Sequence, residues 1–139
     1  MTNRVFLDAS FWIVYRDEKE LRHPVARRMV GELFRQRVHF VATLPVVCEV
    51  HAYFARIRPK RELILKDLCD NPVVMIEEIS HRDQTNALEL LRGHRDKTFS
   101  LCDALSFVTM QRLHLKRALA FDNHFRQFGE FEVIPEKFP

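Results

Sequence analysis

Short apolar runs alternate with longer segments of helical periodicity along almost the whole chain, and this alternation restricts the possible folds more than any other feature. Strands that alternate with amphipathic helices form a parallel sheet with helices on both faces, joined by right-handed crossovers. We therefore predict an α/β fold. The strands are predicted at residues 5–7, 38–42, 73–76, 118–121 and 131–134, and helices are predicted from residue 11 and over residues 24–37, 43–56, 60–69, 80–93 and 100–113.

The chain has the length and the continuity of one domain. Its 139 residues are enough to bury a self-sufficient core, and no repeat, low-complexity tract or linker divides them. Arg4, Asp8 and Asp17 interrupt the only apolar run near the N-terminus, and no window reaches the roughly 18 apolar residues of a membrane span. We therefore predict a single domain over residues 1–139, with no membrane segment and a cytoplasmic location.

The cysteines and the charges restrict the environment of the protein more than its partners. Cys48, Cys69 and Cys102 form no CxxC pair and leave an odd thiol in any disulfide scheme, which favours a reducing compartment. We expect them to be small core residues. The net charge of +3 indicates no partner. Three basic clusters are either solvated helix ends or phosphate contacts, namely Arg56, Arg58, Lys60 and Arg61, then Arg92, Arg95 and Lys97, then Arg112, Lys116 and Arg117.

Aspartates lie next to predicted strands, at what we expect to be one edge of the sheet. Asp8 directly follows the first strand, Asp122 directly follows the fourth, and Asp103 begins the helix that precedes the fourth strand. In open parallel sheets, ligands bind outside the carboxyl ends of the strands. Each aspartate alone is also a common helix N-cap or turn residue, because its short side chain accepts hydrogen bonds from nearby backbone N–H groups.

Asp103 and Glu49 each have a structural explanation that competes with a functional one. Ser100 suits the N-cap position of its helix, so Asp103 falls in the first turn and completes a capping box with Asp in place of Glu. Glu49 lies in the second turn of its helix, inside the apolar run of residues 45–50, which predicts a buried carboxylate. Such a carboxylate needs either a salt bridge to an arginine or a metal cation.

Together the four acids indicate a metal site. Carboxylates that converge without a basic partner raise each other's pKa, so a stable site needs cations. Oxygen ligands suit Mg²⁺ or Mn²⁺, and two such ions about 4 Å apart can activate a water and stabilise the leaving oxygen in phosphodiester cleavage. The sequence offers no competing chemistry, because it has no HExxH or HxH spacing, no GxSxG elbow and no glycine-rich phosphate loop.

The residues around each acid form a short motif. The motifs are Phe6-Leu7-Asp8-Ala9-Ser10, the helical Glu49, Ser100-Leu101-Cys102-Asp103-Ala104 and Phe121-Asp122-Asn123-His124-Phe125. In this order and spacing they resemble the four acidic motifs of PIN-domain nucleases, most of all the VapC-type toxins of bacterial toxin–antitoxin pairs. The resemblance covers about residues 4 to 134.

The resemblance implies a three-layer α/β/α sandwich with a central, mostly parallel sheet, and an endoribonuclease that depends on Mg²⁺ or Mn²⁺. It also implies a homodimer and a cognate antitoxin that holds the enzyme inactive. The fourth motif departs from the family pattern, because Phe121 replaces the usual threonine and Asn123 and His124 replace further acids. Whether the site holds one ion or two therefore stays open. Carried over by position, the acidic metal ligands are Asp8, Glu49, Asp103 and Asp122, and Ser10 matches a hydroxyl often used beside the site.

These residues suggest how RNA could be bound and hydrolysed. Our hypothesis is that the three aspartates hold the metal, while Glu49 is a further ligand or orients the attacking water. Arg95 and Lys97 lie in the loop before the 100–113 helix and are the best-placed phosphate contacts. Asn123 and His124 are further candidate substrate contacts, unless His124 packs in its turn.

Three alternatives are weighed against an RNA hydrolase. A phosphotransfer enzyme with an aspartate nucleophile needs a second acid two residues after Asp8, where Ser10 stands. A receiver-type signalling domain needs an early acidic pair, which is missing. A catalytically inert PIN module that only binds RNA or a protein needs no acids, so the intact set of four argues against it.

Overall fold

A five-stranded sheet forms the centre of the computed structural model, which describes residues 3–136. Its strand order is β3-β2-β1-β4-β5, and every neighbouring pair is parallel. Each strand lies within two residues of its predicted position. The strands are β1 (Arg4–Leu7), β2 (His39–Thr43), β3 (Val74–Glu77), β4 (Arg117–Leu119) and β5 (Glu132–Ile134).

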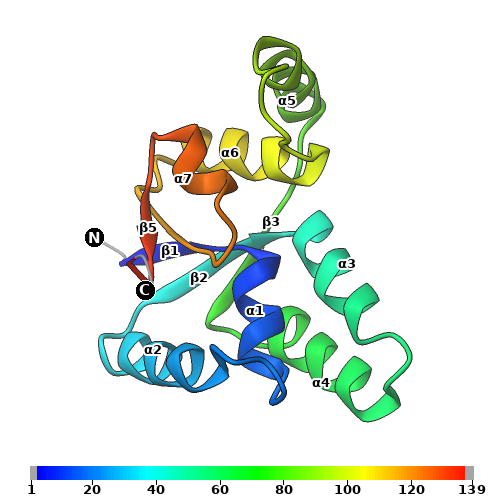
Figure 1. The fold of residues 1–139 in the computed structure, drawn as a ribbon, viewed down its shortest axis with the longest axis vertical. Helices are drawn as coiled ribbons and strands as arrows, with labels where there is room; N and C mark the ends of the chain where they lie inside the picture. The colour runs from blue at the N-terminus through cyan, green and yellow to red at the C-terminus, as the bar shows by residue number, and fades with distance from the viewer. Residues whose placement is uncertain (1–2, 137–139) are drawn as a thin grey trace.

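Helices cover both faces of the sheet (Figure 1). From β1 to β3 each strand is added on the same side of the previous one, so right-handed crossovers place the helices between these strands on one face of the sheet. The chain then returns from β3 to β4 on the far side of β1, so the helices after β3 lie on the opposite face. This confirms the three-layer α/β/α sandwich. One face carries α1 (Ala9–Arg16), α2 (His23–Arg35), α3 (Leu44–Tyr53) and α4 (Arg58–Cys69), and the other carries α5 (His81–Gly93), α6 (Leu101–Leu113) and α7 (His124–Phe128).

The strand order reverses direction between β1 and β4. β1 connects onward to β2 on one side, whereas β4 pairs with its other side, with Leu7 opposite Leu119. The backbone N–H of Asp8 extends this pairing by donating to the carbonyl of Leu119 at 2.9 Å. Such a reversal is where open parallel sheets bind ligands, so the fold places the residues after β1 and β4 at the expected site.

Helix α6 is buried on nearly all sides, and it anchors α7. Every residue from 104 to 110 is buried. Phe107 stacks on Phe128 with ring centroids 4.3 Å apart and contacts Phe125 edge-on at 4.9 Å. These aromatic contacts fix α7, and with it the turn after β4, against a rigid element.

Two expectations about local structure were wrong. Helix α7 was not predicted, and β4 ends at Leu119, so Asp122 lies in the turn before α7 and does not directly follow the strand. Cys48 and Cys69 are exposed and are not core residues, whereas Cys102 is partly buried and packs against the core. Among residues 3–136, no helix combines the length and the apolar character needed to cross a membrane.

Candidate active site

Asp8 is buried at the carboxyl end of β1, where it caps α1. Its Oδ2 accepts hydrogen bonds from the backbone N–H and the hydroxyl of Ser10, at 3.1 and 2.5 Å. Burial and then the charge of Asp122 raise the pKa of Asp8 to about 7. The ionised form of this carboxyl group is therefore costly unless a cation lies nearby.

Ser10 connects the two strand ends that form the site. Besides donating to Asp8, its hydroxyl oxygen accepts hydrogen bonds from the backbone N–H groups of Phe121 and Asp122, at 3.0 and 3.3 Å. The turn that carries Asp122 is thus held directly against the first turn of α1. This places Ser10 beside the acids, where the sequence analysis expected a supporting hydroxyl.

Asp103 lies in the first turn of α6 and forms the predicted capping box. Its backbone N–H donates to the Ser100 hydroxyl at 3.0 Å, and its Oδ2 accepts from the backbone N–H of Ser100 at 2.9 Å. The side chain is buried, with a relative exposure of 6% for the residue. The capping geometry holds the carboxylate toward the end of the sheet, where it meets the turn after β4.

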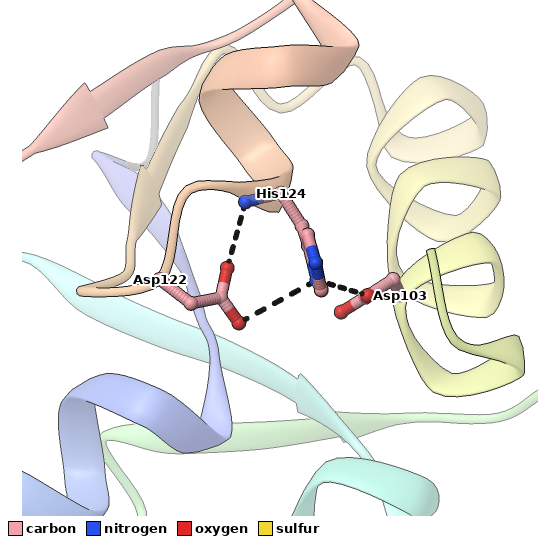
Figure 2. A group of neighbouring side chains, drawn as sticks. All are labelled: Asp103, Asp122 and His124. Atoms are coloured by element: carbon pink, nitrogen blue, oxygen red, sulfur yellow. Dashed lines mark hydrogen bonds and ion pairs between the residues drawn. The ribbon is translucent and has the colours of Figure 1, made fainter. Parts of the chain in front are cut away.

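Asp103, Asp122 and His124 form a compact cluster (Figure 2). One ligand atom from each lies within 4.8 Å of the others. Nδ1 of His124 is 2.7 Å from Oδ2 of Asp103 and 3.9 Å from Oδ2 of Asp122, whose Oδ1 accepts from the backbone N–H of His124. Burial and then the charge of Asp103 raise the pKa of Asp122 above its ordinary value, while the hydrogen bond from His124 opposes this.

Glu49 is exposed, so the prediction of a buried carboxylate was wrong. The buried stripe of α3 consists of Val46, Val47 and Val50, and Glu49 lies on another face of that helix. Its carboxylate nevertheless reaches the thiol of Cys102, whose pKa is raised first by burial and then by Glu49. The charges of Asp8 and Asp103 also raise the pKa of this thiol, so Cys102 lies near all three acids. Glu49 therefore lies at the rim of the acid cluster.

The remaining predicted residues lie outside the cluster. Arg95 and Lys97 are exposed on the loop before α6, and Lys97 pairs with Asp96 at 3.3 Å. Within residues 3–136, no hydrogen bond or ion pair joins either of them to the acids. Asn123 is the exposed N-cap residue of α7, between the two cluster residues of the same turn.

His124 is the residue whose position the sequence analysis did not foresee. It was expected to contact substrate or to pack in its turn, and instead its ring lies between two of the acids (Figure 2). A signal was present, because Gly129 ends α7 with a φ of 81°. A glycine in this left-handed conformation commonly closes a helix, and a short helix there brings its first residue back toward Asp122.

The donor set fits a divalent cation. In the part of the chain that the structure describes, no arginine or lysine forms an ion pair with Asp8, Asp103 or Asp122. Nδ1 of His124 is buried and lacks a hydrogen-bond partner among these residues. Carboxylates whose pKa values are raised by burial and by each other are stabilised by a bound cation, for which carboxylate oxygens are suitable ligands.

Comparison with known proteins assigns the family. The model of the PIN domain matches residues 5–130, which include every acid of this site. The chain belongs to the PIN-domain family. The 23S rRNA-specific endonuclease VapC20 from Mycobacterium tuberculosis is 29% identical over 134 residues, which cover 95% of this chain and 99% of the relative.

Solved structures show the same PIN fold. Crystalline VapC20 from Mycobacterium tuberculosis, described as a sarcin–ricin loop cleaving toxin, matches with a TM-score of 0.82 and 27% identity over 94% of this chain and 99% of its own. A toxin–antitoxin complex from Klebsiella pneumoniae gives a TM-score of 0.69 at 14% identity, covering 97% and 99% of the two chains. FitAcB from Neisseria gonorrhoeae gives a TM-score of 0.66 at 13% identity, covering 93% of this chain and 95% of its own. At these two lower identities the likeness extends to the fold alone.

Proposed function

We propose that this PIN domain is a metal-dependent endoribonuclease and the toxin of a toxin–antitoxin pair. The observation that carries the proposal is the convergence of Asp8, Asp103 and Asp122 from three separate elements, without an arginine or lysine paired to them among residues 3–136. Acids that served only as helix caps would not need to meet. We take residues 1–139 as one domain that carries this activity in the cytoplasm.

In the proposed site three acids share one role and Glu49 has another. Asp8, Asp103 and Asp122 hold Mg²⁺ or Mn²⁺, and Ser10 fixes Asp8 relative to the turn of Asp122. A divalent ion bound there supplies Lewis acidity to the phosphodiester and to a water. Glu49, on the solvent side of Cys102, is placed to complete the ligand set or to orient the attacking water.

RNA is the proposed substrate, and the exposed residues around the acids are its proposed contacts. Arg95 and Lys97 lie on the loop that leads into α6 and can bind phosphates that flank the scissile bond. Asn123 is exposed directly beside Asp122 and can donate to a phosphate or a 2′-hydroxyl. The rRNA specificity in the name of VapC20 supports RNA as the class of substrate.

A cleavage assay tests the activity. Purified protein is incubated with an RNA hairpin of the sarcin–ricin loop sequence and with total RNA, in Mg²⁺, Mn²⁺ or EDTA. We expect endonucleolytic products with either metal, none with EDTA, and none from the Asp103→Asn variant. Equal cleavage in EDTA or by that variant would overturn the metal role. Binding of RNA without cleavage under any condition would instead identify an inert RNA-binding module.

Proposed protein partners are a cognate antitoxin and a second copy of the chain. An apolar groove of about 650 Å³ lies between α3, α5 and α6 and is lined by the exposed side chains of Leu44, Leu88 and Leu101. Exposed apolar surface of this kind is typical of protein interfaces.

Light scattering tests the dimer. We expect the mass of a homodimer for the wild-type protein and of a monomer for Leu88→Glu. A monomeric wild type would refute the dimer. The antitoxin is tested separately, in cells whose growth is arrested by expression of this chain. The product of a reading frame directly upstream of the gene is coexpressed, and we expect it to restore growth and to copurify with this chain.

A further inference from the structure

His124 presents one ring nitrogen to the acids and the other to a hydroxyl. Nδ1 lies between Asp103 and Asp122, whereas Nε2 lies 3.4 Å from the hydroxyl of Thr98. Phe99 contacts the imidazole edge-on, with centroids 5.8 Å apart and an interplanar angle of 83°. Histidines that bind metals commonly hydrogen-bond through their second ring nitrogen in this way, which fixes the orientation of the ring.

The contact of Nδ1 with Asp103 is close but is not a hydrogen bond. The two atoms are 2.7 Å apart, yet Nδ1 is buried and has no hydrogen-bond partner among residues 3–136. A histidine that served only to neutralise Asp103 would align its N–H with the carboxylate oxygen. The observed arrangement instead leaves Nδ1 beside two carboxylates as an atom that can bind a metal ion (Figure 2).

The spacing of these atoms suits a shared ion. In an octahedral shell with ligands at about 2.1 Å, neighbouring donors are about 3.0 Å apart and opposite donors about 4.2 Å apart. The separations of Nδ1 from Asp103 and Asp122, 2.7 and 3.9 Å, fall near these two values. Both separations thus suit ligands of one ion, and the ligand atoms of Asp103 and Asp122 lie within 4.8 Å of each other.

We propose that His124 is a nitrogen ligand of the metal and makes this site prefer Mn²⁺, or a later first-row ion, over Mg²⁺. The inference rests on the proposed metal role of the acids. An imidazole nitrogen is a softer donor than a carboxylate, and it favours transition ions over Mg²⁺, which selects oxygen ligands. His124 would in this way add one nitrogen to the oxygen ligands of Asp103 and Asp122.

Pulsed electron paramagnetic resonance of the Mn²⁺-loaded protein tests the ligand directly. Wild-type protein is prepared with natural histidine and with ¹⁵N-labelled histidine, and Mn²⁺ is the probe. We expect nitrogen modulation of the electron spin echo that changes with the label and disappears in His124→Ala. His81→Ala is the matched control, because His81 is an exposed histidine in the first turn of α5, and the modulation should persist there.

Calorimetry gives the second readout. We expect the wild-type protein to bind Mn²⁺ at least about tenfold more tightly than Mg²⁺, a ratio within the range that single side chains contribute to metal sites. His124→Asp, which offers oxygen in place of nitrogen, should reduce this ratio to near one. Circular dichroism checks that each variant is folded. Where a variant is unfolded, the labelled wild type still shows whether a histidine nitrogen binds the ion, and absence of label-sensitive modulation there overturns the inference.

The outcomes separate this inference from the proposed function. Mn²⁺ bound without nitrogen modulation, and with equal affinity for Mg²⁺, overturns the role of His124 and leaves the acids as the metal site. A wild-type protein that binds neither ion overturns both. Label-sensitive modulation that persists in His124→Ala assigns the nitrogen to another residue and also overturns the inference.

Discussion

Two capping boxes of this molecule have the same local design and different surroundings. Ser80 and Asp83 start α5, and Ser100 and Asp103 start α6, with both reciprocal hydrogen bonds present in each. Both aspartates are buried, with exposures of 2% and 6%. Asp83 is paired through both oxygens with Arg112, at 3.0 Å each, whereas Asp103 faces Asp122 and His124.

This difference is the one expected between an aspartate with a structural role and the proposed metal ligand. Burial alone raises the pKa of Asp83, but hydrogen bonds from Arg112 and Ser80 outweigh it and hold that pKa below its ordinary value. Near Asp103, by contrast, the pKa values of Asp8 and Asp122 are raised. The capping box is therefore the same at the start of α5 and of α6. What differs is the arginine that pairs with Asp83 and has no counterpart beside Asp103 among residues 3–136.

The largest expected effect is a loss of RNA cleavage when Asp103, in the capping box of α6, is replaced. Asp103→Asn keeps an acceptor for the Ser100 backbone N–H but removes a charged ligand, so RNA cleavage should fall by about 10³-fold, or about 4 kcal/mol of transition-state stabilisation. The free energy of unfolding in urea should change by less than about 1 kcal/mol. Retained cleavage in a folded variant would show that Asp103 is only a cap.

The next effect is a dependence of stability on pH in the metal-free protein. Asp8 binds a proton more tightly when folded, with a pKa of about 7 against 3.8, so its contribution to stability is present below pH 4 and is lost as the pH rises through 7. Each unit of pKa shift corresponds to about 1.4 kcal/mol, which gives a loss of a few kcal/mol between pH 4 and 8. Urea unfolding across this range measures it.

The matched variant for this pH dependence is Asp8→Asn, which mimics the protonated group. Without metal at pH 8 it should be more stable than the wild type, and its stability should fall less between pH 4 and 8. Added Mn²⁺ should stabilise the wild type far more than the variant. An identical pH dependence in the two proteins would exclude Asp8 as its source.

A smaller effect, on stability, is expected when Asp83 in the capping box of α5 is replaced. Asp83→Asn breaks the charged contact with Arg112 and should lower the free energy of unfolding by about 1–3 kcal/mol, in the range of hydrogen bonds to charged groups. Cleavage per folded molecule should stay at the wild-type level, because Asp83 lies outside the site. Chemical denaturation and the RNA assay together check this, and a catalytic defect in the folded variant would contradict the comparison.

The smallest effect comes from one extra methylene. Glutamate serves in capping boxes as well as aspartate, so Asp103→Glu and Asp83→Glu should each change stability by less than about 1 kcal/mol. Only Asp103→Glu should impair cleavage, by about tenfold, because a displaced ligand alters the geometry of the site. Equal activity of the two variants would remove the distinction between the boxes.

The sheet and the convergence of three of the four acids could be predicted from the sequence for a clear physical reason. Parallel strands share one carboxyl edge, so the residues after β1 and β4 had to lie close together once the alternation of strands and helices was recognised. Asp103 followed from its capping box, whose geometry is local and readable. These features depend on short-range patterns combined with one topological rule.

The errors arose where short-range patterns were uninformative. Glu49 was expected to be buried because the apolar residues around it obscured the helical stripe of Val46, Val47 and Val50. Helix α7 has only five residues, too few to be stable without tertiary contacts, and packing of Phe125 and Phe128 against Phe107 supplies them. Gly129 indicated where such a helix would end, but the position of His124 depended on these tertiary contacts.

The hydroxyl of Ser10 accepts hydrogen bonds from backbone groups 111 and 112 residues further along the chain. Protein synthesis proceeds from the N-terminus, so Asp8 leaves the ribosome long before Asp122 exists to meet it. A nascent chain that has not yet been extended past β4 lacks the turn that closes the acid cluster. The acid cluster can therefore form only after the chain has been extended past the turn that follows β4.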